Sequence, residues 1–136
     1  YAACRQTDTP RTLHDIAQAG NINKKNLSRS YRDLIKTLDL KVRPFDSSEF
    51  ITRISSEVDI SEKTRRVALN IISQAVEKEI SAGKNPLALA AAALYISCVL
   101  NQERKKQADI AKASGITAVT IRNRSMALRK DLGIKI

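Results

Sequence analysis

The segment from Leu87 to Leu100 is apolar on every side, and it constrains the fold more than any other part of the chain. Asn85 followed by Pro86 supplies a helix cap and a favoured first-turn residue directly before it. A helix without a polar face is stable in water only when other elements surround it. The run is also shorter than the roughly 20 residues that span a bilayer. We therefore predict a central, buried helix in a protein that does not cross a membrane.

Apolar residues recur at helical spacing on both sides of this segment. Aromatic residues make up only 4% of the chain, with four glycines and three prolines, which argues against a β-sandwich or barrel. We predict four further helices: one starting at Asp46, one from Ser61 to just before Gly83, and one each over residues 105–114 and 117–132. The inward stripes of the first two are Phe50, Ile51, Ile54 and Val58, and then Val67, Ala68, Ile71, Ile72, Ala75, Val76 and Ile80.

The chain contains an internal repeat, because residues 1–34 align without a gap with residues 95–128. Such self-similarity marks duplicated structural units. We predict the last part of a first copy at residues 1–38, a linker at 39–45 and a complete second copy at 46–136. The eight identical pairs are Tyr1 with Tyr95, Cys4 with Cys98, Asp15 with Asp109, Ile16 with Ile110, Ala17 with Ala111, Ala19 with Ala113, Ile22 with Ile116 and Leu34 with Leu128.

The first copy lacks the helices that open the second one. The sequence begins with Tyr1 instead of Met, and its first residues resemble the end of an apolar helix. We therefore expect this sequence to be cut from a longer protein. Without its partner helices, an apolar face of residues 1–38 would stay uncovered, which predicts instability or self-association in this copy.

Basic residues are concentrated at the end of each copy. The chain carries 24 Lys and Arg against 14 Asp and Glu, a net charge of +10 at pH 7. Residues 1–44 hold nine basic and four acidic side chains, residues 45–103 hold six and eight, and residues 104–136 hold nine and two. A surface that serves only solubility mixes both signs. The pattern therefore indicates an anionic partner, such as nucleic acid or an acidic surface.

The basic end of the second copy has the spacing of a helix-turn-helix. Ala111 is small where a second helix would cross closely, and Gly115 suits the left-handed backbone of a turn. Ile116 and Ile121 would anchor the two helices to each other. The first copy repeats the pattern with Ala17, Asn21, Ile22 and Leu27, and Asn tolerates a left-handed backbone better than most residues. Because many such helix pairs touch no DNA, a purely structural pair is the alternative.

Short side chains surround one arginine on the last predicted helix. A slim leading turn, an arginine for guanine acceptors and an apolar contact for a thymine methyl suit a helix that enters the major groove. Val119 and Arg122 are neighbours on one face. An ordinary solvated helix with Val119 half buried is the alternative. With Ile121 and Leu128 turned inwards, the outward residues are Thr117, Ala118, Val119, Thr120, Arg122, Asn123 and Ser125.

The sequence shows no catalytic or metal-binding pattern. His14 has no second His or Cys at ligand spacing, so we expect it to be solvated or to cap a helix. Cys4 and Cys98 lie on apolar helices without a nearby His that would support a nucleophile. Phosphate-binding loops, paired catalytic acids and serine elbows are missing as well. We predict a soluble, non-enzymatic protein of a reducing intracellular compartment, with no cofactor, no metal and no small-molecule substrate.

Several segments resemble a known family. Together with the two-copy layout, they make the whole chain similar to the core domain of transcription factor B, the archaeal counterpart of eukaryotic transcription factor IIB. The resemblance implies an all-α fold of cyclin-like repeats, in which a five-helix repeat ending in a helix-turn-helix follows the last helices of a truncated first repeat. The segments are LAAAALYIS at Leu89–Ser97, GITAVTIRNR at Gly115–Arg124, TPRTLHDIA at Thr9–Ala17 and SRSYRDL at Ser28–Leu34.

The same resemblance implies a function in transcription initiation. Such a protein binds the TATA-binding protein on promoter DNA and helps to recruit RNA polymerase. Its second helix-turn-helix resembles the reader of the B recognition element beside the TATA box, which would place Val119 and Arg122 at base edges. The protein would be cytoplasmic and nucleoid-associated in an archaeon, and nuclear in a eukaryote. The residues expected near DNA phosphates are Thr117, Thr120, Arg124, Arg104, Lys105 and Lys106.

Two other functions fit the same residues. The first is a regulator that uses the helix-turn-helix alone, as a dimer on a palindrome, and binds DNA tightly without a partner. The second is a cyclin-like module for protein binding, such as a kinase activator, in which the basic face is incidental. That module would show a shallow salt dependence and no preference for a DNA sequence.

Overall fold

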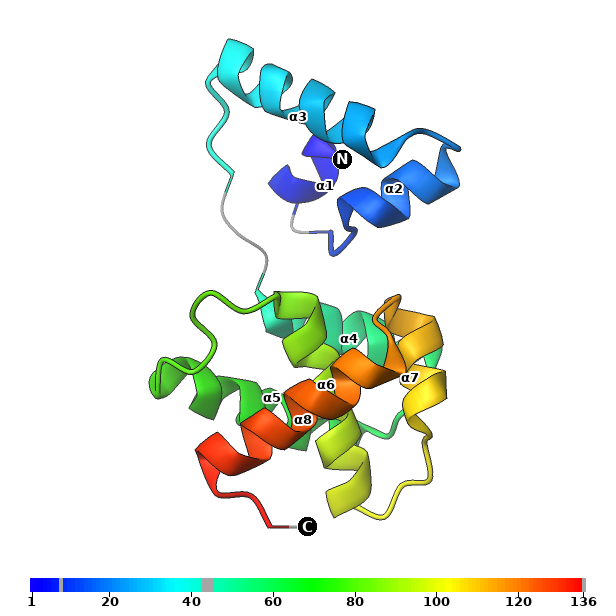
Figure 1. Cartoon of the computed structure of the whole chain (residues 1–136), viewed down its shortest axis with the longest axis vertical. Helices are drawn as coiled ribbons and strands as arrows, with labels where there is room; N and C mark the ends of the chain where they lie inside the picture. The colour runs from blue at the N-terminus through cyan, green and yellow to red at the C-terminus, as the bar shows by residue number, and fades with distance from the viewer. Residues whose placement is uncertain (8, 43–45, 136) are drawn as a thin grey trace. The chain divides into compact units, whose positions relative to one another are not determined.

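The computed structural model describes residues 1–7, 9–42 and 46–135, and every element of regular secondary structure in these ranges is an α-helix (Figure 1). The predicted all-α fold is confirmed. The chain divides into two compact units, Tyr1–Phe45 and Asp46–Ile136. Residues 43–45 of the predicted linker and Ile136 lie outside the described residues.

The first unit contains α1 (Ala2–Gln6), α2 (Leu13–Ala19) and α3 (Lys24–Leu38). Thr12 begins α2 with a capping box: its hydroxyl accepts from the Asp15 N–H, and the Asp15 carboxylate accepts from the Thr12 N–H. The side chain of Asn23 caps α3. The rings of Tyr1 and Tyr31 pack edge to face with centroids 4.6 Å apart, which links the start of α1 to α3.

The first unit exposes much of its apolar surface. Ile22, Leu34 and Leu38 are 48%, 41% and 58% exposed. Leu128, which occupies the place of Leu34 in the second copy, is only 1% exposed. The apolar face predicted for residues 1–38 is therefore present at these three side chains, and the self-association expected from it stays a prediction.

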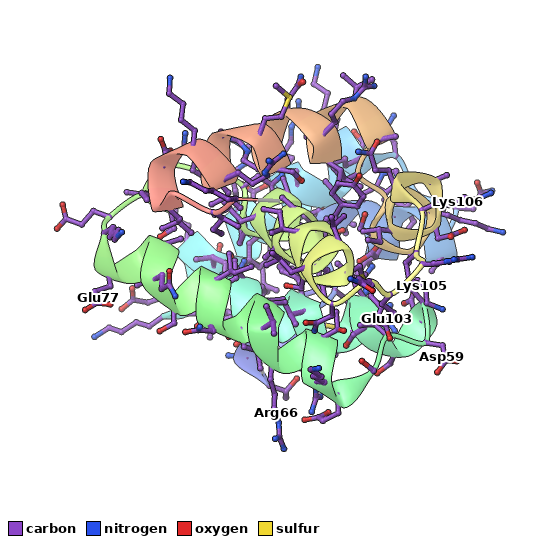
Figure 2. The ribbon with its side chains drawn as sticks, turned by 90° about the horizontal axis from the view of Figure 1, so that it is seen from below. Asp59, Arg66, Glu77, Glu103, Lys105 and Lys106 are labelled. Carbon is purple, nitrogen blue, oxygen red and sulfur yellow. The ribbon has the colours of Figure 1, made fainter. Side chains whose placement is uncertain are left out.

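The second unit consists of five helices in its described part, as predicted. Figure 2 looks nearly along α6, which lies in the centre with α5 on one side and α8 on the other. Residues 90–93 of α6 are all alanine and fully buried, and their small side chains let the neighbouring helices approach closely. The helices are α4 (Ser47–Glu57), α5 (Glu62–Glu77), α6 (Pro86–Leu100), α7 (Gln107–Ser114) and α8 (Ala118–Leu132).

The end of α5 differs from the prediction because a local turn interrupts the apolar pattern. α5 ends at Glu77, well before Gly83, since Glu79 adopts a left-handed φ of 58° and the Ile80 N–H donates to the Ala75 carbonyl. Val76, expected in the core, is 55% exposed.

The starts of the last two helices also shift. α7 begins at Gln107 instead of residue 105, because the Lys105 N–H donates to the Glu103 carbonyl in a tight turn before the helix. α8 begins at Ala118, and Thr117 is its cap and not its first residue. The expected helix pair α7–α8 is nevertheless present.

The turn between α7 and α8 uses the left-handed backbone that the sequence predicts. Gly115 has a φ of 75°, and Asn21 at the same place in the first unit has a φ of 51°. A Cβ added to Gly115 would meet nothing within 4 Å, so a side chain there is penalised by the backbone alone.

We therefore expect Gly115→Ala to lower the free energy of unfolding by about 1 to 2 kcal/mol, measured by urea denaturation. Asn21→Gly is the matched control, because it keeps the same conformation accessible and should not destabilise the chain. A Gly115→Ala variant as stable as the wild type would mean that this turn does not depend on a glycine.

Candidate nucleic-acid interface

α8 is fixed on the core by one face, which leaves the other face to solvent. Ile121 and Leu128 of α8 are 0% and 1% exposed, and Ile110 of α7 is fully buried. α8 packs mainly on α6, and α7 contacts α6, α8 and α4. The second helix of the pair is therefore anchored to the core along one face.

The outward face of α8 carries the two residues predicted at base edges. Val119 is 57% exposed, and Arg122 is exposed three residues later. Met126, 60% exposed, lies on the same face two turns after Val119. Met126 was not predicted from the sequence, although its spacing of seven residues from Val119, about two helical turns, is the signal that would identify it.

Ser125 was wrongly predicted to lie on the outward face. It is 3% exposed, and its hydroxyl donates to the Ile121 carbonyl at 2.6 Å. The physical reason is its position four residues after Ile121 and three before Leu128, which places it on the inward side of the helix. Ser125 therefore packs against the core and is not available to a ligand.

The other residues predicted near phosphates at this helix do not all lie on its outward face. The Thr117 hydroxyl caps the helix by accepting from the Thr120 N–H at 3.2 Å, and the two hydroxyls are 2.8 Å apart. Thr117 is exposed and Thr120 is half-buried. Arg124 follows Arg122 by about 200° around the helix and is half-buried, so the structure separates it from Val119 and Arg122.

Arg104, Lys105 and Lys106, here called the basic turn, connect the end of α6 to α7. Arg104 and Lys106 are exposed and Lys105 is half-buried. They border an open hollow of about 770 Å³, which is also lined by Tyr95 of α6 and Ala118 of α8. The structure thus brings the basic turn and the start of α8 to one surface of the second unit.

Glu103, which the sequence reasoning did not single out, directly precedes the basic turn. Its Oε1 accepts from the Ser61 N–H at 3.0 Å. Burial raises the pKa of this carboxyl, but hydrogen bonds from Ser61 and Thr64 and the nearby charge of Lys105 outweigh that effect, so the pKa of Glu103 lies below its ordinary value. Glu103 is therefore ionised at neutral pH.

Cys98 has the environment of a structural thiol. Burial raises the pKa of the Cys98 thiol to about 11, and the Glu103 carboxylate adds to this rise against the opposing effect of Lys105. At neutral pH the thiol is protonated and acts as a small apolar group, not a nucleophile.

The described residues also lack two kinds of arrangement. They contain no group of three or more His, Cys, Asp and Glu side chains placed to hold a metal ion. In the same part of the chain, each helix is too short or too polar to span a membrane.

Comparison with known proteins identifies relatives of the chain. The family model described as "Transcription factor TFIIB repeat" matches residues 40–131. Over all 136 residues, the chain is 44% identical to Transcription initiation factor IIB of Sulfurisphaera tokodaii and 40% identical to that of Archaeoglobus fulgidus. It is also 40% identical to Transcription initiation factor IIB 2 of Thermococcus kodakarensis. The chain spans 44%, 42% and 44% of these relatives, respectively, so it corresponds to less than half of each.

Proposed function

The chain belongs to the transcription factor TFIIB repeat family, and from that premise we propose that it is the promoter-binding core of a general transcription initiation factor. In this proposal it binds promoter DNA together with the TATA-binding protein and helps to recruit RNA polymerase. The observation that carries the proposal is the outward face of α8, where Val119 and Arg122 are exposed together while the opposite face is buried in the core.

The proposed DNA contacts follow from this geometry. α8 enters the major groove at the B recognition element beside the TATA box. Arg122 donates to the O6 and N7 acceptors of a guanine, and Val119 contacts a thymine methyl. These two side chains supply the sequence preference.

The phosphate contacts come from the residues that border the same surface. In the proposed complex they position the duplex and carry no sequence information of their own. The basic turn supplies charge, and the hydroxyls of Thr117 and Thr120 flank the start of α8. Arg124 is half-buried on another side of the helix, so in the proposed complex it is at most a peripheral phosphate contact. The protein acts as a bridge between DNA and other proteins, without a catalytic step.

A fluorescence anisotropy titration of a labelled promoter duplex tests this function. We expect weak binding by the chain alone and much tighter binding in the presence of the TATA-binding protein, with a steep loss of affinity as salt rises. The matched control is the same duplex with a scrambled recognition element.

Two results would contradict the proposal. Tight binding to a palindromic duplex without the TATA-binding protein would indicate a regulator that acts alone. Binding that ignores the element and the partner, with a shallow salt dependence, would indicate a protein-interaction module whose basic face is incidental.

A further inference from the structure

A polar network fastens the end of α6 to the start of α5. The Ser61 N–H donates to Glu103 Oε1 at 3.0 Å, and the Ser61 hydroxyl donates to Thr64 Oγ1 at 3.1 Å. Asn101 Nδ2 donates to the same Thr64 oxygen at 3.1 Å. Thr64 is only 1% exposed, and Glu103 Oε2 is buried. The Thr64 side of the network is thus shielded from water, and hydrogen bonds are stronger in such a buried environment.

The backbone around Glu103 is equally constrained. Gln102 adopts a left-handed φ of 56°, and the Glu103 N–H donates to the Cys98 carbonyl at 2.8 Å. Two residues later, the Lys105 N–H donates to the Glu103 carbonyl at 2.9 Å. The residue directly before the basic turn, Glu103, is therefore held by hydrogen bonds of both its main chain and its side chain.

Figure 2 shows Glu103, Lys105, Lys106 and Asp59 at the same end of the unit, where α6 ends and α5 and α7 begin. Lys106 points away from the helices, while Glu103 lies closer to them. The carboxylate accepts from the cap residue of α5, at a helix start whose partial positive charge favours an anion. The Glu103 carboxylate thus binds to the start of α5, although Glu103 is next to the basic turn in the sequence.

We propose that Glu103 is a positioning residue for DNA binding: its carboxylate fastens the turn after α6 to the start of α5, and so holds Arg104, Lys105 and Lys106 in place for the phosphate backbone. This inference rests on the proposed function, because it concerns how the same surface meets promoter DNA. It assigns to an acidic residue a favourable role at a surface that binds an anion.

The positioning role and a purely electrostatic role of Glu103 predict opposite changes in DNA affinity when its carboxylate is removed. If Glu103 acted only through its negative charge, its removal would relieve repulsion and tighten DNA binding. If it positions the basic turn, Glu103→Ala weakens binding because the three cations lose their common placement. The removal of one ionic interaction with a phosphate lowers the salt slope by about 1, which corresponds to about a fivefold weaker affinity at roughly 0.15 M salt.

The experiment compares variants by anisotropy titration in the complex with promoter DNA and the TATA-binding protein, over a series of KCl concentrations. Glu103→Ala should weaken binding and reduce the salt slope, whereas Glu103→Gln, which keeps an oxygen to accept from Ser61, should retain the wild-type slope. Asp59→Asn is the charge control, because Asp59 is exposed on the turn before α5. It should bind as tightly as the wild type or more tightly.

Thr64→Val provides a second variant that breaks the network without changing any charge. It should also reduce the salt slope, and circular dichroism at the assay temperature reports whether each variant is folded. Unchanged slopes in folded Glu103→Ala or Thr64→Val overturn the positioning role, while partner-dependent binding by the wild type keeps the proposed function intact. A wild type that shows no such binding overturns both.

Discussion

Arg122→Ala is expected to weaken binding to promoter DNA that carries the recognition element by about 1 to 3 kcal/mol, in the presence of the TATA-binding protein. The reason is that Arg122 is exposed on the outward face of α8, where its guanidinium has the donors for both guanine acceptors. On a duplex with a scrambled element, the variant should bind nearly as well as the wild type, so that the preference for the element disappears.

Arg104→Ala is the matched control for this prediction. It removes one cation from the basic turn and should weaken binding to both duplexes alike, with a salt slope lower by about 1. An equal loss on both duplexes for Arg122→Ala would make Arg122 a phosphate contact. No loss on either duplex would mean that α8 does not read DNA.

Leu128→Ala is expected to lower the free energy of unfolding of the second unit by about 2 to 5 kcal/mol. Leu128 is 1% exposed on the inward face of α8, so its truncation leaves a cavity on the side of α6, the helix on which α8 mainly packs. The same change weakens the packing of α8, the proposed recognition helix, on α6, so DNA binding should fall together with stability. Urea denaturation followed by circular dichroism measures the stability change.

The internal repeat supplies the control, because Leu34 occupies the same place in the first unit and is 41% exposed. Leu34→Ala should therefore lower the free energy of unfolding by less than about 1 kcal/mol. Similar losses for the two variants would show that the buried surface at Leu128 does not decide the stability of the unit.

Features with a local cause could be predicted from the sequence. The sequence predicts α6 at its observed bounds. The Asn85–Pro86 pair marks the start of the helix, and the continuous apolar run after it marks its length. Gly115 and Asn21 likewise predict two left-handed turns, since few residues accept that backbone. The predicted end of α5 was wrong, because the apolar spacing continues to Ile80 after the chain has already turned at Glu79.

The candidate site was predictable where it lies on one helix, and not where it joins distant segments. Val119 and Arg122 share a face because of their spacing, and the spacing of Ser125 from Ile121 and Leu128 is the signal that would have placed it on the inward face. Ser61 and Glu103 are separated by 42 residues and meet only because α5 and α6 pack together. No pattern within either segment predicts that hydrogen bond.

Hydroxyl-radical footprinting of the promoter complex tests directly whether α8 binds DNA beside the TATA box. We expect that adding the chain to the complex of DNA and TATA-binding protein protects further nucleotides over the recognition element, next to the box. Arg122→Ala should lose that protection at a concentration where the wild type retains it. A footprint identical to that of the TATA-binding protein alone, at a saturating concentration of the chain, would show that α8 does not bind DNA there.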